Sequence, residues 1–403
     1  SGEDLTWSVS SQADFLSFDK KSGSCAYNTI DEFMVQLNRQ HLSEDSIRAH
    51  FTISTNLGDN ITIGVTVFNY PEKKWRITKL YEDMAYDPAT NELIVLYNYN
   101  LNNPQIIGVF DLNQMTRVDY SFPEYNFDQY NFDGKLAYNT NSRKGYILCD
   151  NQILEFDMNS KTITKNWNLN ISNTRKVIHD QDHKLYFLMY SSEVFCVFDT
   201  EEGELSSYDL SFYLSYSLDL CLHPSGKYIY GAGYSDLFKI DISGIEPDLV
   251  YNTYHNCEQG IWCPGDGNKL FTANAQVLTI DPDLPGSDVI SEEDLEISAD
   301  MINYLTYNAA KQEYYVAPYT YSSGSFNSSV LVLDANLALS DMLYLEPFYY
   351  SSYLGQGYQT ENAYAKRLFV DESGNKIIAI TDSQDNYSIG PDWGIEIINR
   401  TKK

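Results

Sequence analysis

The stretch LDLCLHPSGKYIYGAGYSDLFKID, residues 218–241, decides the fold class. Its first two apolar runs flank the turn HPSGK, and a third apolar run ends at Asp241. Short apolar runs on both sides of a turn rich in Gly and Pro are typical of β-hairpins. The stretch therefore predicts three consecutive antiparallel strands.

The same pattern recurs along the whole chain. Apolar strands that end in Asp or Asn close at Asn69, Asp111, Asp157, Asp199, Asp241, Asp281, Asp334 and Asn399. The separations are 42, 46, 42, 42, 40, 53 and 65 residues, and a period of about 40 to 45 residues belongs to four-stranded propeller blades. A hairpin signature precedes each of these strands, and no helical periodicity of any length separates them. We therefore predict an all-β fold, a closed β-propeller of four-stranded blades, with eight blades expected and seven as the alternative.

The two ends of the chain are predicted to meet in one blade. Only four residues follow Asn399, too few for a fourth strand. Leu5 to Ser10 alternate apolar and polar side chains, as a half-buried strand does. We predict that this N-terminal strand pairs with Gly394–Asn399 and closes the last blade, because a closed ring leaves no open sheet edge.

Residues 1–403 are accordingly expected to form a single propeller domain. Residues 30–62 are expected to be an insertion in the first blade or a divergent part of it. Within them, Phe33, Met34 and Leu37 have the spacing of a short helix. The count of seven blades applies if this segment is not a blade.

The segment HPSGKYIYGAG, residues 223–233, resembles the hairpin of the YVTN and WD40-like propeller superfamily. In that group a strand, a Pro-x-Gly-Lys turn and a second strand precede the strand that ends in Asp. The chain is most similar to secreted or lipoprotein propellers of Gram-negative bacteria. The resemblance spans essentially the whole chain and implies the fold.

The composition is that of a globular, strongly acidic protein. Hydrophobic residues make up 43% of the chain and charged residues 21%, which is enough apolar material for a large core. Asp and Glu number 56 and Lys and Arg 27, for a formal charge of −29. Such a surface repels phosphate backbones, so nucleic acid is not expected as a partner. No run of about 18 to 20 apolar residues occurs, so no membrane-spanning helix is expected.

Tyrosine is unusually abundant, with 34 residues. Many of them fall in segments that would connect the blades, where Tyr and Trp rings can stack on sugar rings. Residues 347–364 form the longest such segment, and we predict that it folds over the top face near the propeller axis. The predicted ligand-binding residues are Tyr130, Tyr254, His255, Trp262, Tyr349, Tyr350, Tyr353 and Tyr358. The alternative is that these rings pack between neighbouring blades.

Signatures of catalysis are few. The six histidines match no HExxH pattern, and no GxSxG or phosphate-loop motif occurs. His179, His183 and His223 fall in polar turns, where we expect solvated side chains. We predict no catalytic residue, no metal ligand and no cofactor. A glycosidase-like carboxylate pair and a calcium ion at the acidic run 292–296 are left open.

The six cysteines give no zinc-site spacing. Cys149, Cys196 and Cys221 lie in predicted strands, where a free thiol is usually a small buried side chain. Cys257 and Cys263 flank one loop, and a disulfide between them is left open.

Together these observations favour a non-catalytic binding protein. The expected ligand is a glycan, another polar small molecule or a protein partner, held on the top face near the axis. An enzyme of the lactonase, lyase or glycosidase type is one alternative, and a structural interaction scaffold is the other. We expect a monomer that is secreted, periplasmic or on the outer cell surface, including a lipoprotein whose anchor has been removed.

Overall fold

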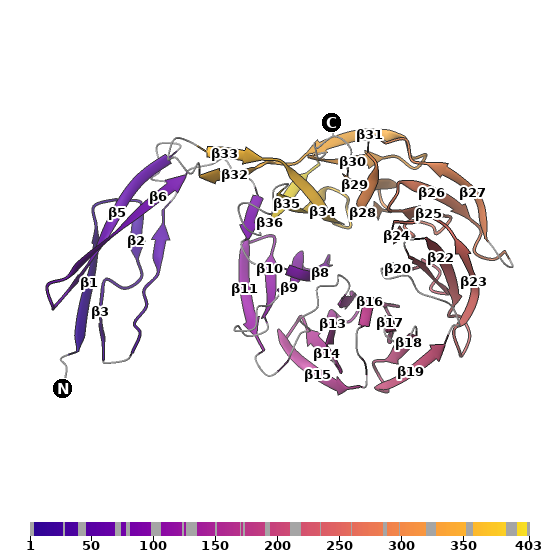
Figure 1. Cartoon of the computed structure of the whole chain (residues 1–403), viewed down its shortest axis with the longest axis horizontal. Helices are drawn as coiled ribbons and strands as arrows, with labels where there is room; N and C mark the ends of the chain where they lie inside the picture. Colours follow the sequence, from indigo (N-terminus) through magenta and orange to yellow (C-terminus); the bar gives the residue numbers. More distant parts are fainter. Residues whose placement is uncertain are drawn as a thin grey trace. The chain divides into compact units, whose positions relative to one another are not determined.

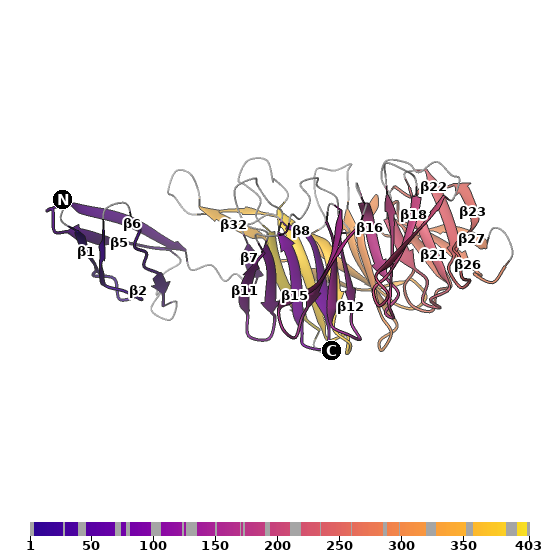
Figure 2. The same ribbon diagram turned by 90° about the horizontal axis from the view of Figure 1, so that it is seen from below.

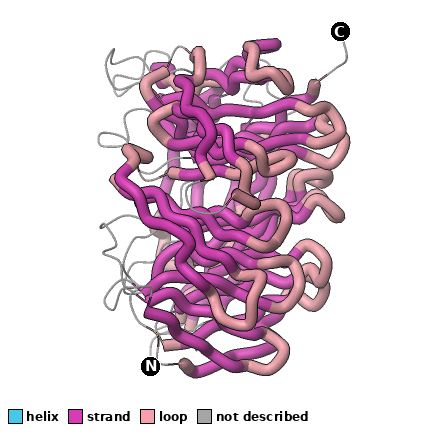
Figure 3. Tube along the Cα trace, turned by 90° about the vertical axis from the view of Figure 1, so that its right-hand side faces the viewer, coloured by secondary structure: helices cyan, strands magenta, loops and turns pink. Residues whose placement is uncertain are grey.

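The chain forms two compact units, and the computed structural model describes most of each. Unit 1 combines Ser1–Glu72 with Tyr349–Thr360, and unit 2 combines Lys73–Phe348 with Glu361–Lys403. The described residues are 4–26, 29–38, 46–68, 74–77, 81–97, 106–122, 125, 135–149, 151–169, 171, 174–189, 194–209, 219–233, 235–258, 260–284, 288–297, 299–319, 328–351, 358–383 and 393–400. Among them no helix is long and apolar enough to cross a membrane, and Figure 3 shows strands joined by loops.

Unit 1 is built on a four-stranded antiparallel sheet with the strand order β3-β1-β5-β6. Its strands are β1 (Leu5–Ser11), β3 (Ser22–Cys25), β5 (Ser46–Thr55) and β6 (Asn60–Phe68), while β2 (Leu16–Phe18) pairs with β4 (Val35–Leu37). Alternation along β1 buries Trp7 and Val9 beside Phe51. The same alternation leaves Thr6 and Ser8 exposed on the opposite face.

The short helix expected around Phe33, Met34 and Leu37 is not formed, because this segment is extended and contributes β4. An extended chain turns only one of the three side chains into the core. The Phe33 ring lies 5.0 Å from the Trp7 ring, whereas Met34 is 60% and Leu37 45% exposed. Packing on Trp7 therefore outweighs the helical spacing.

Unit 2 contains seven four-stranded antiparallel sheets in its described residues. In the first six, four strands follow the chain in order. The first three sheets are β8 (Tyr81–Asp87), β9 (Glu92–Tyr97), β10 (Ile106–Asp111), β11 (Thr116–Ser121); β12 (Leu136–Asn139), β13 (Lys144–Cys149), β14 (Gln152–Asp157), β15 (Thr162–Asn168); and β16 (Thr174–His179), β17 (Lys184–Met189), β18 (Val194–Asp199), β19 (Glu204–Asp209). The next three are β20 (Asp219–Leu222), β21 (Tyr228–Ala232), β22 (Asp236–Asp241), β23 (Asp248–Tyr254); β24 (Ile261–Trp262), β25 (Lys269–Thr272), β26 (Gln276–Ile280), β27 (Val289–Asp294); and β28 (Met301–Asn308), β29 (Glu313–Tyr319), β30 (Ser329–Leu333), β31 (Leu339–Tyr344).

The seventh sheet takes its outer strand from a distant part of the chain. It consists of β34 (Ala363–Val370), β35 (Lys376–Ser383), β36 (Trp393–Asn399) and β7 (Lys74–Ile77). The N-terminal strand predicted for this place, Leu5 to Ser10, pairs instead with β3 and β5 of unit 1. The prediction was wrong because alternation shows that a strand is half-buried without showing which sheet it joins. Trp75 and Ile77 of β7 supply the apolar side chains that this sheet needs.

The recurrent Asp is explained by the turns that follow the third strand of the sheets. Oδ1 of Asp111 accepts the backbone N–H groups of Asn113 and Gln114 at 2.8 and 2.9 Å. In the same way, Oδ1 of Asp199 accepts hydrogen bonds from the backbone N–H groups of Glu201 and Glu202. An Asp side chain that caps its own turn satisfies donors that would otherwise be lost at the strand end. The predicted strand ends at these positions are therefore confirmed.

The sheets of unit 2 lie around a ring, with strands such as β8, β16, β20 and β28 on the inner side (Figure 1). Figure 2 shows these sheets from the side, with their strands running between the two faces of the ring. Apolar clusters fill the spaces between neighbouring sheets, as a propeller requires. In one of them Phe110 of the first sheet packs against Trp393 of the last, with ring centroids 6.2 Å apart.

Two departures from the predicted repeat have a structural cause. Residues 65–68 of the predicted strand that ends at Asn69 lie in β6, which belongs to the sheet of unit 1. The 65-residue interval before Asn399 contains an extra hairpin, β32 (Phe348–Ser351) paired with β33 (Tyr358–Glu361). Most of this hairpin, Tyr349–Thr360, belongs to unit 1.

Candidate functional site

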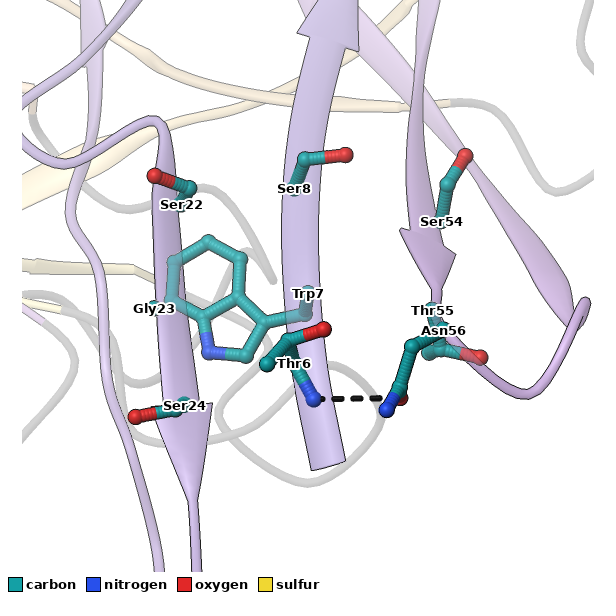
Figure 4. A pocket seen from close by; sticks show the side chains of 9 residues that line it. All are labelled: Thr6, Trp7, Ser8, Ser22, Gly23, Ser24, Ser54, Thr55 and Asn56. Atoms are coloured by element: carbon teal, nitrogen blue, oxygen red, sulfur yellow. Dashed lines mark hydrogen bonds between the residues drawn. The ribbon is translucent and has the colours of Figure 1, made fainter. Parts of the chain in front are cut away.

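A shallow groove crosses the exposed face of the unit 1 sheet (Figure 4). It has a volume of about 590 Å³ and runs over three strands, β3, β1 and β5. The residues that line it are Thr6, Trp7, Ser8, Ser22, Gly23, Ser24, Ser54, Thr55 and Asn56. Register explains the lining, because Thr6 lies opposite Ser24, and Ser8 lies between Ser22 and Ser54. Two rows of short polar side chains therefore border a floor made of backbone.

The groove floor is held in place from its opposite face. Alternation turns the Trp7 ring away from the hydroxyl rows, and its indole N–H donates to Oδ2 of Asp31 at 2.9 Å. The ring covers Gly23 on the neighbouring strand, where a Cβ would lie 2.7 Å from Cζ2 of Trp7. On the groove side, Oδ1 of Asn56 accepts the Thr6 N–H at 3.1 Å, and the Asn56 amide donates to the Asp4 carbonyl. None of the nine lining residues is charged.

Unit 2 carries a second polar arrangement on the inner strands of its ring. Arg367 of β34 forms an ion pair with Asp83 of β8 and donates to the Met84 carbonyl at 3.1 Å. Asp83 is 2% exposed and also accepts the Leu136 N–H of β12 at 2.8 Å. One buried carboxylate therefore links three consecutive sheets.

Similar contacts continue around the ring. Nζ of Lys135 donates to the Thr174 carbonyl at 2.9 Å, and Nζ of Lys176 lies 2.8 Å from Oδ1 of Asp219. The Asn303 amide donates to a backbone carbonyl of β34 at 3.2 Å. We call the following six residues the axial belt: Asp83, Lys135, Lys176, Asp219, Asn303 and Arg367.

β-Bulges help to aim these side chains. Register shifts occur in β8, β16, β28 and β34, next to or at belt residues. Lys176 lies within one of these bulges and has a φ of 24°, a backbone angle that residues other than glycine rarely adopt. Bulges are over-represented where a strand must re-aim a side chain. Burial lowers the pKa of Lys176, but the Asp219 carboxylate raises it by more. The pKa of Lys176 therefore lies above its usual value.

A sequence signal for the belt exists and was missed. A charged residue stands four positions before the residue that ends or follows the inner strand: Asp83 before Asp87, Lys135 before Asn139, Asp219 before His223, and Arg367 before Asp371. A fixed offset of this kind shows that the side chains lie at one level of neighbouring strands.

The predicted aromatic residues are placed as follows. Tyr254 ends β23 and is 81% exposed. The next residue, His255, donates its N–H to the Ser235 carbonyl at 3.0 Å, and its Nδ1 lies 4.0 Å from Oε2 of Glu292. Trp262 is half-buried in β24 and packs 6.3 Å from the Tyr304 ring.

The remaining predicted residues lie on other segments. Tyr349 is half-buried in β32. Tyr350 and Tyr358 belong to β32 and β33, and their side chains lie outside the described residues, as do Tyr130 and Tyr353 altogether. Since Tyr349–Thr360 belongs to unit 1 and Tyr254 to unit 2, a shared pocket for the eight residues stays a prediction.

Two histidines expected to be solvated are buried. His179 is 6% and His223 is 4% exposed. The His179 ring stacks on Tyr146 with centroids 5.0 Å apart, and its Nδ1 accepts the Gln181 N–H at 2.8 Å. Burial lowers the pKa of His179 to about 4. The expectation failed because each ring folds back into its own turn.

The free energy of unfolding is expected to rise with pH between about 4 and 6.5 because of His179. In the unfolded chain the His179 imidazole binds a proton near its usual pKa. In the folded protein the same imidazole stays neutral until about pH 4. Acid therefore favours unfolding, by about 2 to 3 kcal/mol at pH 4.5. Urea titrations at pH 7 and 4.5 should show this loss in the native protein and a smaller loss in His179→Gln. An identical loss in both proteins would contradict the assignment.

All six cysteines are free thiols, so Cys257 and Cys263 form no disulfide. Burial raises the pKa of each of these two thiols to about 12. They therefore stay protonated at neutral pH and are poor nucleophiles. Among the described residues, no three His, Cys, Asp or Glu side chains are grouped as they would be around a metal ion.

Comparisons with known proteins identify the fold. No protein-family model and no curated protein sequence matches the chain. Among solved structures, the β-propeller domain of Myceliophteria thermophila Cps50 (Swd1) matches with a TM-score of 0.53 and 10% sequence identity. The match covers 81% of this chain and 100% of that domain. At this identity the likeness shows the fold alone: the chain contains a β-propeller.

Proposed function

We propose that this protein is a non-catalytic binding protein of the periplasm or outer cell surface that takes an uncharged polar ligand, with glycans as the first class. The unit 1 groove is the observation that carries the proposal. All nine residues that line it are uncharged, in a chain with a formal charge of −29.

The groove chemistry suits a polyol. A Ser or Thr hydroxyl offers one donor and two acceptor lone pairs, as a sugar hydroxyl does. The hydroxyls of Ser8, Ser22 and Ser54 line one row of the groove, and short side chains leave the floor open. A neutral ligand exchanges its water hydrogen bonds for these without the cost of burying a charge.

For unit 2 we propose a closed seven-bladed propeller of the YVTN type. Pairing of β36 with β7 and the packing of Phe110 on Trp393 support closure. The axial belt supports a binding role over the lactonase, lyase and glycosidase alternatives, because Asp83 and Asp219 are each ion-paired and act as links between sheets. Ligand contacts of the propeller, with glycan or protein, would then fall on its edge around exposed Tyr254.

The test is a screen of neutral glycans by array, followed by calorimetry with three variants. Ser8→Lys fills the groove with a charged side chain and should weaken binding at least about tenfold. Ser10→Lys places the same charge on the same exposed strand face outside the groove lining and should bind normally. If Tyr254→Ala alone abolished binding, the glycan site would lie on the propeller and not in the groove of unit 1. A protein that binds no neutral glycan would contradict the proposal.

A further inference from the structure

The last strand of the unit 1 sheet, β6, is paired on one side only among the described residues. In the order β3-β1-β5-β6 it pairs with β5 along its whole length and with no other described strand. It spans nine residues, Asn60–Phe68, so a long row of backbone N–H and C=O groups faces away from β5. Such an edge is a template for another strand.

This edge lacks the features that usually prevent pairing. Edge strands are commonly blunted by charged residues, by Pro or by a bulge. β6 reads NITIGVTVF and contains none of these residues, and its register with β5 runs unbroken from Ser54↔Asn60 to Ser46↔Phe68. The outer strands of unit 2 differ: β27 carries Glu292, Glu293 and Asp294.

Apolar side chains beside the edge are also uncovered. Ile61 is 55% and Ile63 is 39% exposed. Register places them on the core face of the sheet, since Ile61 lies opposite Ile53 and Ile63 opposite Phe51. The core face of the sheet therefore ends in exposed isoleucine side chains, which another strand alongside β6 would cover.

The sequence of β6 is complementary to itself. Around Gly64 the residue types mirror each other: Ile63 and Val65, Thr62 and Thr66, Ile61 and Val67. In an antiparallel pair centred on Gly64, each position faces its mirror position, so that isoleucine is paired with valine and threonine with threonine. Pairs of both kinds stabilise antiparallel sheets. A Cβ built at Gly64 meets nothing within 4 Å, so the centre has room for a partner.

We propose that β6 pairs with β6 of a second copy of this chain, antiparallel, about a two-fold axis at Gly64. The two four-stranded sheets then become one eight-stranded sheet, and the interface is isologous, as in most homodimers. This assembly replaces the monomer expected from the sequence. It rests on the edge and its residues alone and stands whether or not the groove binds glycans.

Sedimentation of the full chain at micromolar concentration tests the proposal. The native protein should have twice the 46.2 kDa mass of one chain. Ile63→Lys puts a charge on the edge strand and should give the single-chain mass. Ile30→Lys also exchanges an exposed apolar side chain of unit 1, 88% exposed, for lysine, and should remain a dimer. A native protein of single-chain mass, or a dimer that survives Ile63→Lys, overturns the proposal.

A cross-linking experiment tests the register and does not depend on how Ile63→Lys folds. Only the residue on the two-fold axis faces its own copy, so Gly64→Cys should form an intermolecular disulfide under mild oxidation. Thr62→Cys faces position 66 of the other copy and should not link to itself. Equal cross-linking of the two variants, or none with Gly64→Cys, excludes this pairing.

Discussion

A chain that begins at Lys73 is expected to keep a cooperatively folded unit 2, and a chain that begins at Thr78 is expected to lose it. The difference is the strand β7. Ile77 is 3% exposed and lies in the cluster that joins the last sheet to the first. The Trp75 ring packs 4.8 Å from Phe110. Losing the half-buried Trp75 and the buried Ile77 costs about 2 to 5 kcal/mol each, a large part of a total stability of about 5 to 15 kcal/mol.

Thermal melts followed by circular dichroism, with size-exclusion chromatography, measure this effect. The shorter chain should lack a cooperative transition or elute as aggregate, because the β36 edge is then open. Deletion of residues 1–10 is the control: β1 belongs to unit 1, so the transition of unit 2 should not change. If both truncations melt alike, β7 does not complete the seventh sheet.

Asp288→Ala is expected to lower the free energy of unfolding by about 3 to 5 kcal/mol. Asp288 is 0% exposed, and its Oδ2 lies 2.9 Å from Nζ of Lys239. It also accepts the hydroxyl groups of Tyr230 at 2.5 Å and Tyr251 at 2.7 Å. Burial and this carboxylate raise the pKa of both tyrosines, so they remain donors. Without Asp288, a buried ammonium group loses its counter-ion and two phenols lose their acceptor.

Urea denaturation of single and double variants separates the cost of the orphaned charge from that of the lost side chain. Lys239 is 1% exposed, so Lys239→Met removes the buried cation with a side chain of similar volume. The double variant Asp288→Ala, Lys239→Met should recover much of the stability, since an apolar replacement of a buried pair is often near neutral. A double variant as unstable as Asp288→Ala would show that the ion pair is not the source of the loss.

The repeat was predictable because its cause is local. Asp111 and Asp199 cap turns within three residues of themselves, so the same residue must recur wherever the turn recurs. Strand pairing across the chain has no such signal. LTWSVSS and KWRI both offer alternate apolar residues, and only packing, Trp7 on Phe33 and Trp75 on Phe110, decides which sheet each joins.

The candidate sites were less predictable from the sequence. A tyrosine in a loop and one between sheets look alike: Tyr254 is 81% exposed, while Tyr230 and Tyr315 are fully buried. The groove was missed because Ser and Thr are ordinary residues of an exposed sheet face. Its signal was the alternation of uncharged Ser and Thr along β1 and β3 and at Thr52 and Ser54 of β5. That signal is useful only once the register of the strands is known, and the sequence does not contain the register.

The seventh sheet has a consequence for how unit 2 comes apart. An open stack of repeats frays from its two terminal repeats, which have one neighbour each. In the closed propeller that we propose, β7 from the beginning of unit 2 pairs with β36 at its end, and no sheet is terminal. Native-state hydrogen exchange should therefore show no gradient of protection from the first sheet to the last, and the innermost amides of all seven sheets should exchange through one global opening.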